Sequence, residues 1–478
     1  MKRLISPSQN NPFKYKKMPY QNELADKTSH IDIVKNPDVE EFLGKCHKID
    51  YPDGEEISSL TSVFKTTPLS DFKKPKNIIS IDGSYYESSV TEKFPSRKIG
   101  FIKIGVILLK YNVLDNIGND SSFVDPFEVA KFKENNDSYS IILPSANIVY
   151  SNCSDVKDSF RNALEDQFDR LRTVKDNPET SLKTTLFKLA SYLEECSESK
   201  IKLSKCPSCG EDKDIYVFKD QINKCPHCQK PLYVTDVLRV WEQVDGMNSS
   251  ISAITRTMNV VERLIAVHYI RTIVEKSKDS FVETLENICF FIDGPLAIFG
   301  EPAKLHSCIM KYLGEINQEM RSHGKSDIMM IGVQKSGAIN DFLNLIKDSI
   351  PSNTIYCLDD SFRYKNINVG MKQANDTYGK ETYFGQDFLY KSSTGKLFVF
   401  NVPYPWKTKS ATSNFANEKS NILNYPNIGT YTSILNDFEC QMYENSLIPT
   451  ILAHKYTAIS LAPGSKVLDL LAKSNIEV

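Results

Sequence analysis

No run of eighteen apolar residues occurs in the sequence, so we expect no membrane-spanning helix. The first twenty residues, MKRLISPSQNNPFKYKKMPY, contain five Lys or Arg and no acid, but they lack the apolar stretch of a signal peptide and are read as a solvated tail. The G-x-x-x-x-G-K-[ST] loop that cradles nucleotide phosphates is missing too. We therefore expect no ATP hydrolysis, and a phosphohydrolase acting on nucleotides is disfavoured.

An excess of positive charge, which would mark a nucleic-acid-binding protein, is also missing. Lys and Arg number 58 against 60 Asp and Glu, and the formal net charge is −2. Binding of DNA would therefore depend on local basic patches or on delivery of the strand by a partner.

Cysteine usage indicates metal binding rather than disulfides. Of eleven cysteines, seven are scattered without paired spacings, which fits a reducing cytoplasm. The other four read C-x2-C, a gap over residues 210–224, and C-x2-C again: Cys206, Cys209, Cys225 and Cys228. Four thiolates satisfy tetrahedral Zn²⁺, so we predict a structural zinc ribbon, with His227 pointing away from the metal. A closed four-sulfur site has no open position for substrate, and we assign it no catalysis.

Two roles for this ribbon remain open. It can fold a short insert whose core is too small to fold alone, or it can hold DNA or a partner protein. The charge around the cysteines leans basic and mildly favours the second role, through Lys202, Lys205, Lys213, Lys219, Lys224 and Lys230.

The order of the predicted elements indicates an α/β fold, a mixed sheet with helices packed on it. Strands are expected over residues 77–83, 97–111, 137–150, 287–294, 327–337 and 396–405. Helices are expected over residues 155–174, 181–196, 258–277, 304–324, 338–349 and 447–462. Gly100 and Gly105 are expected to break or bend the second strand.

The chain is long enough for a substantial core and is divided into four parts on these patterns. Residues 1–75 form a polar, partly helical segment. The α/β domain follows in two halves, 76–200 and 236–478, and the zinc ribbon, 201–235, is an insertion between them.

Two of the predicted strands run into the same three residues, Ile-Asp-Gly. NIISIDG contains Asp82, and ICFFIDG contains Asp293. One such Asp is more often a turn residue or a helix cap, but the repeated pattern favours a common purpose. If the strands are neighbours, both acids can reach one divalent cation, and Mg²⁺ and Mn²⁺ prefer such hard oxygen ligands. We expect Gly83 and Gly294 to let the chain leave each strand sharply, so that the acids open into a cleft.

A third ligand should come from an element that packs over the strand ends. Glu262 lies in RTMNVVERLIAVHYIR, a helix whose neighbours are largely apolar, and a buried Glu without a partner is disfavoured. Ion pairing with Arg256 or Arg263 is the alternative explanation for this residue.

The order of these motifs resembles that of the NurA nuclease family. The resemblance rests on IDGS in the first strand, an Arg…Glu helix, a second strand leading into DGPL, and a C-terminal helix containing Ala-His. It extends from about residue 76 to the C-terminus, with the zinc ribbon as an insertion. The family implies an RNase H-like core, Mn²⁺-dependent cleavage of DNA, and a homodimer. It also implies a partner, the ring-shaped hexameric HerA-type ATPase that drives DNA.

By this resemblance Asp82, Glu262 and Asp293 match the metal-binding acids of the family. His454 matches its C-terminal histidine, although a helix histidine satisfied by a neighbour is the alternative, and Lys335 matches a lysine near the site. Many members have a tyrosine eight residues before the histidine. Here that position is Ser446 and the nearest tyrosine is Tyr443, which leaves the aromatic role unassigned.

The sequence therefore supports two hypotheses. The first is a cytoplasmic, metal-dependent DNA nuclease that works with a HerA-type ATPase in DNA end processing, DNA repair or anti-phage defence. The second is an adaptor on an RNase H-like fold that has lost catalysis and grips DNA or protein through its zinc ribbon. The acids at the strands argue against the second, because a decayed site has no reason to keep them.

Overall fold

The computed structural model describes residues 30–46, 54–68, 73–111, 136–368, 377–440, 446–461 and 463–475. Contacts divide the chain into two units, Met1–Pro52 and Asp53–Val478. In the first unit, helices α1 (Ile31–Val34) and α2 (Pro37–Gly44) form, and none of their residues is buried. Helix α2 begins after Asn36, whose side chain accepts a hydrogen bond from the Asp38 N–H at 2.9 Å.

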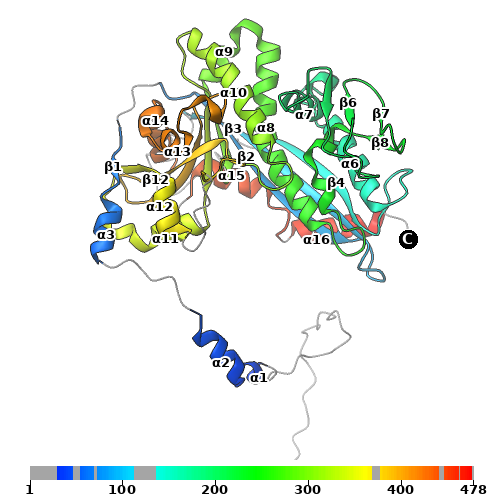
Figure 1. The fold of residues 1–478 in the computed structure, drawn as a ribbon, viewed down its shortest axis with the longest axis horizontal. Helices are drawn as coiled ribbons and strands as arrows, with labels where there is room; N and C mark the ends of the chain where they lie inside the picture. The colour runs from blue at the N-terminus through cyan, green and yellow to red at the C-terminus, as the bar shows by residue number, and fades with distance from the viewer. Residues whose placement is uncertain are drawn as a thin grey trace, which may run out of the picture. The chain divides into compact units, whose positions relative to one another are not determined.

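The larger unit is built on a nine-stranded mixed sheet with the order β1-β11-β12-β13-β10-β9-β2-β3-β4 (Figure 1). The strands are β1 (Lys65–Thr66), β2 (Asn77–Ser89), β3 (Lys98–Lys110), β4 (Asn136–Ala146), β9 (Ile288–Asp293), β10 (Met329–Gln334), β11 (Thr354–Cys357), β12 (Gly385–Lys391) and β13 (Leu397–Pro403). Strands β2, β9 and β10 run parallel, and the other neighbours pair antiparallel. The predicted mixed sheet is confirmed. Residues 54–68, which the sequence analysis placed in the N-terminal segment, belong to this unit because β1 pairs with β11.

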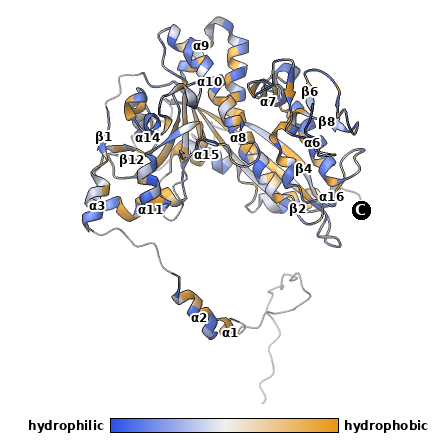
Figure 2. Ribbon diagram, viewed as in Figure 1, coloured by the Kyte–Doolittle hydropathy of each residue, from blue (hydrophilic) through white to orange (hydrophobic). Residues whose placement is uncertain are grey.

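Helices cover both faces of the sheet. The face that carries Ile79 and Ile81 of β2 packs against α6 (Val156–Arg170), α7 (Leu182–Ala190), α8 (Ile251–Ser277) and α10 (Leu305–Ser322). The face that carries Ile78 packs against α14 (Ile428–Asp437) and α15 (Ile448–Thr457). Figure 2 shows hydrophobic residues along α8 and the central strands; the strands are enclosed between two helix layers, and much of α8 is buried against the sheet.

Strand β2 does not end at Asp82, contrary to the expectation from the Ile-Asp-Gly pattern. It continues to Ser89, because β3 pairs with it along its whole length, from Asn77↔Lys110 to Ser89↔Lys98. Strand β9 does end at Asp293, where Gly294 takes a φ of +82°.

Strand β3 is continuous as well, so the expected break at its glycines is wrong. The two glycines let helices approach the sheet from opposite sides. A Cβ on Gly100 would lie 2.3 Å from Ile254 Cδ1 of α8, and one on Gly105 would lie 2.6 Å from Thr457 Cγ2 of α15. Because glycine has no side chain, each helix can pack directly against the strand backbone at these two positions.

The cysteine segment forms two small hairpins, β5 (Lys200–Lys202) with β6 (Tyr216–Phe218) and β7 (Asn223–Lys224) with β8 (Pro231–Leu232). Their buried residues Ile201, Val217 and Leu232 join the same hydrophobic cluster as α6, α7 and α8. The ribbon is therefore packed into the core of the larger unit.

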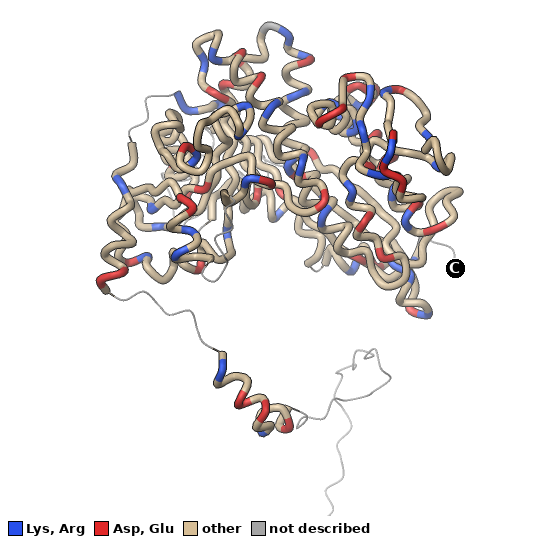
Figure 3. The backbone as a smooth tube through the Cα atoms, viewed as in Figure 1, with Lys and Arg blue, Asp and Glu red and all other residues tan. Residues whose placement is uncertain are grey.

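Charges of both signs are interspersed along the chain (Figure 3), in line with its near-zero net charge. In the described part of the chain, no helix combines the length and apolar character that crossing a membrane requires.

Candidate active site

Asp82 and Asp293 occupy matching positions on the neighbouring parallel strands β2 and β9. Ile81 pairs with Ile292 in the β2–β9 register, so the next residue of each strand is an Asp. Phe291 packs in the cluster on the α15 face, and side chains two residues apart share a face, so Asp293 points the same way. Asp82 also points to this face, where it meets α15.

Asp82 is 2% exposed and fully hydrogen-bonded. Its Oδ1 accepts from the Gly83 N–H at 2.9 Å, and its Oδ2 accepts from the Thr457 hydroxyl at 3.0 Å. His454 Nδ1 lies 3.0 Å from the same Oδ2. Burial raises the pKa of Asp82 and the nearby Asp293 carboxylate raises it further, against the opposing effects of Lys335, Thr457 and His454.

His454 is therefore hydrogen-bonded to a neighbour, which is the alternative considered from the sequence. That neighbour is Asp82, itself a candidate catalytic acid. With Nδ1–H donating to Asp82, Nε2 is left as the free lone pair of the ring, and the side chain is 58% exposed. Thr457 was not found from the sequence, although it follows His454 by one helical turn and shares its face. Ser446 precedes α15, where its carbonyl accepts from the Cys440 N–H at 3.1 Å, and Tyr443 lies outside the described residues.

Glu262 reaches the site from α8, on the other face of the sheet. The Glu262 carboxylate packs against Gly83, which has no side chain. A Cβ at position 83 would lie only 2.8 Å from Glu262 Oε1. Burial raises the pKa of Glu262 to about 8, with Arg263 lowering it and the charges of Asp82 and Asp293 raising it. The three carboxylates therefore share one electrostatic environment.

Arg263 is the partner of Glu262, and Arg256 is not. Arg263 Nη1 forms an ion pair with Glu262, and its Nη2 donates to the Asp293 carbonyl at 3.1 Å. Arg256 instead lies 3.5 Å from Glu301 Oε2 and donates to a backbone carbonyl. The pairing alternative for Glu262 is observed, and the pair also ties α8 to the end of β9.

Lys335 follows β10 directly and faces Asp293, with its Nζ 3.1 Å from Asp293 Oδ1. Both side chains keep access to solvent, at 25% and 28% exposure. The preceding residue, Gln334, donates to Asp387 of β12 at 2.6 Å. Asp387 is buried and also forms an ion pair with Arg363. This buried pair anchors the strand end that presents Lys335.

Carboxylate oxygens are the ligands that Mn²⁺ and Mg²⁺ prefer. Burial is the main cause of the raised pKa values of Asp82 and Glu262, and the charges of the neighbouring acids raise them further. The chemical type of these ligands fits such an ion. The three carboxylates are not gathered into one closed cage for a single ion. Among the described residues, only the cysteine group brings all its candidate ligand atoms within 4.8 Å of one another. Arg263 and Lys335 partly compensate the acids in this arrangement.

The four cysteines converge as the sequence predicts and could hold a zinc ion. The Sγ atoms of Cys206 and Cys228 are 3.7 Å apart, and those of Cys209 and Cys225 are 3.8 Å apart. Desolvation raises the pKa of the Cys225 thiol, but N–H groups of the second knuckle outweigh it and lower that pKa to about 7. His227 is outside the group, with its Nε2 3.2 Å from the Lys213 carbonyl.

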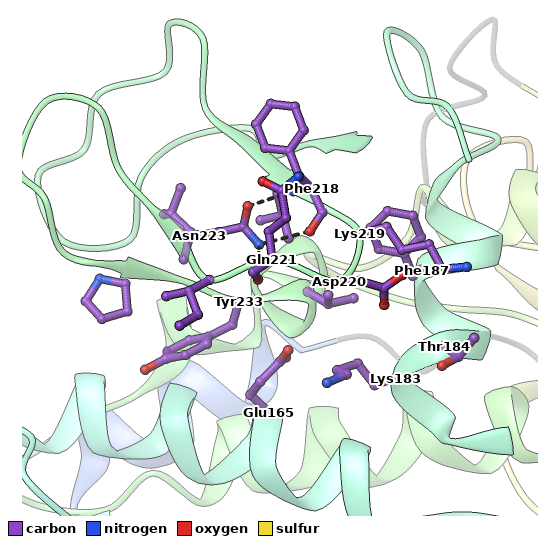
Figure 4. A pocket seen from close by; sticks show the side chains of 15 residues that line it. Glu165, Lys183, Thr184, Phe187, Phe218, Lys219, Asp220, Gln221, Asn223 and Tyr233 are labelled. Atoms are coloured by element: carbon purple, nitrogen blue, oxygen red, sulfur yellow. Dashed lines mark hydrogen bonds between the residues drawn. The ribbon is translucent and has the colours of Figure 1, made fainter. Parts of the chain in front are cut away.

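A pocket of about 460 Å³ lies between the ribbon and helices α6 and α7 (Figure 4). Its rim is the loop between β6 and β7, closed by Asn223, which accepts from the Phe218 N–H at 2.8 Å. At its base, Glu165 of α6 accepts from the backbone N–H and the hydroxyl of Thr235. None of the candidate metal-binding acids lines this pocket, so it is separate from the carboxylate site.

Replacing Gly83 with Ala should lower activity at the carboxylate site by about tenfold, because the added Cβ displaces Glu262 and Met258 Sδ, which lies 2.6 Å away. The matched control is Gly100→Ala, whose Cβ crowds the same helix at Ile254. Both variants should lose similar stability in urea, about 1–3 kcal/mol. Equal activity in the two would remove the link between Gly83 and Glu262.

The stability of the metal-free protein should fall as pH rises from about 5 to 8. The folded-state pKa of Glu262, about 8, lies above its ordinary value of 4.5. The folded state therefore binds more protons than the unfolded state between these values, and this stabilisation is lost as the pH rises through them. Thermal unfolding across this range should show a smaller pH slope in Glu262→Gln than in the wild type. Identical slopes would contradict the assignment of the raised pKa to Glu262.

The sequence matches no protein-family model, and no curated protein matches it either. Solved structures also match it, among them the following two. One is described as the crystal structure of NurA, with 12% identity over 94% of this chain and 98% of that chain, at a TM-score of 0.26. The other is described as NurA bound to dAMP and manganese, with 11% identity over 95% and 98% of the two chains, also at a TM-score of 0.26.

Proposed function

We propose that this chain is a DNA nuclease that depends on Mn²⁺ or Mg²⁺. The proposal is supported by the register of β2 and β9, which places Asp82 and Asp293 at matching positions of neighbouring strands. It is also supported by Glu262 of α8, which lies close enough for the charges of both acids to raise its pKa. Acids whose pKa values are raised by burial and by one another's charge are typical of functional sites, including sites that hold a cation. When bound there, the ion supplies an activated water and neutralises charge on a phosphate.

The residues of the chain divide the remaining work. Asp82, Glu262 and Asp293 provide oxygen ligands. Lys335, solvent-accessible beside Asp293, donates to a phosphate oxygen and stabilises the charge that develops on it. His454, held by Asp82 through Nδ1, keeps Nε2 free to accept or return a proton at the cleaved bond.

The partners follow from the motif resemblance and are part of the same proposal. A chain of net charge −2 binds DNA weakly alone, so a HerA-type hexameric ATPase would deliver the strand and raise its local concentration. The chain would act as a homodimer in the cytoplasm, in DNA end processing or in defence against phage.

One observation favours the second candidate, an inactive adaptor. Arg263 and Lys335 already pair with Glu262 and Asp293, so the acids are partly compensated without a metal. In that case the ribbon, with its surrounding lysines, would do the binding.

A metal titration with a cleavage assay separates the two. End-labelled DNA is incubated with the purified chain, with and without the ATPase, in Mn²⁺, in Mg²⁺ and without either. A nuclease degrades the DNA only with a hard cation and shows a weak Mn²⁺ site besides tightly held zinc. An adaptor shows zinc alone and leaves the DNA intact, which would end the nuclease proposal.

A further inference from the structure

The zinc ribbon exposes apolar side chains beside its pocket, and its basic charge is partly compensated. Ile222, in the loop between β6 and β7, is 93% exposed, and Phe218 at the end of β6 is 42% exposed. Three of the six lysines near the cysteines form ion pairs: Lys202 with Glu195, Lys205 with Glu242 and Lys230 with Asp158. Exposed apolar residues around a pocket, with little free positive charge, favour a protein partner over DNA.

The pocket beneath this loop has a half-buried acid at its base. Glu165 lines the pocket from α6, and Figure 4 shows its carboxylate pointing toward the ribbon. Thr235 donates its N–H at 3.0 Å and its hydroxyl at 2.9 Å to Glu165 Oε2, while Oε1 accepts no hydrogen bond from any described residue. Burial raises the pKa of Glu165, against the lowering effects of Thr235 and Lys183. Oε1 is therefore an acceptor that lacks a donor.

The lysines that line the pocket interact with acids outside it. Lys183 Nζ lies 2.6 Å from Asp169 Oδ1, and Lys219 interacts electrostatically with the exposed Glu198. Asp220, the second acid of the lining, forms no ion pair or side-chain hydrogen bond within the described part of the chain. The pocket thus contains negative charge that its own lysines leave unpaired.

The wall between the acid and the loop is largely apolar. Phe187 of α7 and the ribbon residues Val217, Leu232 and Tyr233 line it. A long basic side chain can pack its aliphatic stem on such a wall while its charged end reaches a carboxylate. The guanidinium of arginine suits this acid best, because its planar fork of donors can serve Glu165 Oε1 and still bond a second acceptor.

We propose that this pocket docks a partner protein by taking up an arginine side chain that is flanked by apolar residues. The guanidinium pairs with Glu165 and Asp220, and the flanking residues contact Phe218 and Ile222 at the rim. The ribbon then forms one wall of the binding site, and α6 and α7 form the other. The inference does not depend on the proposed function, because none of the candidate metal-binding acids lines the pocket.

The test uses fluorescein-labelled peptides that share the sequence Gly-Ser-Ala-Leu-X-Leu-Ala-Ser-Gly and differ only at X, which is Arg, Gln or Glu. Binding to the full chain loaded with zinc is measured by fluorescence anisotropy. The Arg peptide should bind at least about tenfold more tightly than the Gln peptide, and the Glu peptide should bind most weakly. Glu165→Gln retains an oxygen that can accept from Thr235, so the loop should stay in place. It should weaken binding of the Arg peptide about tenfold and leave the Gln peptide within about twofold.

A second variant tests the rim of the pocket. Ile222→Ser should weaken binding of every peptide about threefold to tenfold, because the apolar contact at the rim is lost. The matched control is Leu423→Ser, since Leu423 is 84% exposed and does not line the pocket. This control should bind all the peptides as the wild type does. The melting temperature of each variant checks that it is folded.

The outcomes separate this inference from the proposed function. It is overturned if the Arg peptide shows no binding at about 1 mM, or binds Glu165→Gln as tightly as the wild type. If Ile222→Ser instead loses affinity for a labelled DNA duplex and keeps its affinity for the peptides, the ribbon holds DNA and the docking site is rejected. Metal-dependent DNA cleavage should be equal in Glu165→Gln and the wild type. A chain that never cleaves DNA but binds the Arg peptide through Glu165 would keep the pocket and reject the nuclease.

Discussion

Asp82→Asn should lower metal-dependent DNA cleavage by at least about a thousandfold, a loss of about 4 kcal/mol of transition-state stabilisation. Asn keeps the size of the side chain but removes the charge that a hard cation requires. The same change removes a buried carboxylate whose pKa is already raised by burial and by Asp293. The variant should therefore unfold at the same temperature as the wild type or at a higher one, because it removes an acid whose burial beside Asp293 destabilises the folded state.

The control for this prediction is Asp348→Asn, an exposed carboxylate on the 3-10 turn after α11 (Ala338–Ile346), where cleavage should not change. Rates are measured on end-labelled DNA under single-turnover conditions with saturating Mn²⁺. A folded Asp82→Asn protein that cleaves at the wild-type rate would exclude the carboxylate site as the catalytic centre.

Cys225→Ser should destabilise the larger unit by several kcal/mol and release zinc. Cys225 is buried, and it belongs to the same hydrophobic cluster as Ile201, Leu232 and the helices α6, α7 and α8. Ligand loss therefore opens part of the main core rather than a separate appendage. We expect a large fall in the melting temperature together with loss of metal measured by mass spectrometry of the intact protein.

Cys46→Ser provides the matched control, because Cys46 is exposed and lies in the N-terminal unit. It should keep both zinc and stability. A Cys225→Ser protein that unfolds at the wild-type temperature would show that the cysteine cluster is structurally dispensable.

The two Ile-Asp-Gly sequences show how far local pattern can be trusted. At β9 the glycine adopts a positive φ and ends the strand, as expected from the pattern. At β2 the same three residues lie in the middle of a strand, because β3 pairs beyond them. There Gly83 makes room for Glu262 to approach from α8. Whether such a glycine ends a strand or makes room for a side chain depends on the elements that pack against it, which the local sequence does not show.

Apolar periodicity predicted the core strands and helices, since burial on a fixed face imposes it on the sequence. The spacing of the cysteines predicted that the four sulfurs converge, because tetrahedral metal binding restricts how far apart the ligands of each pair lie in the sequence. Partners distant in sequence carry no such signal. The Arg363–Asp387 pair behind Lys335 joins residues from separate elements, and nothing in the local sequence around either one announces it.

The ion pairs of the site have a thermodynamic consequence. Lys335 is occupied by Asp293, and Arg263 by Glu262, so each basic group serves as an internal counterion. A divalent ion held by Asp293 would compete with Lys335 for that carboxylate, and the lysine ammonium would then be free to donate to a phosphate. Affinity for the ion and affinity for DNA should then rise together, and by the same factor in either order of addition.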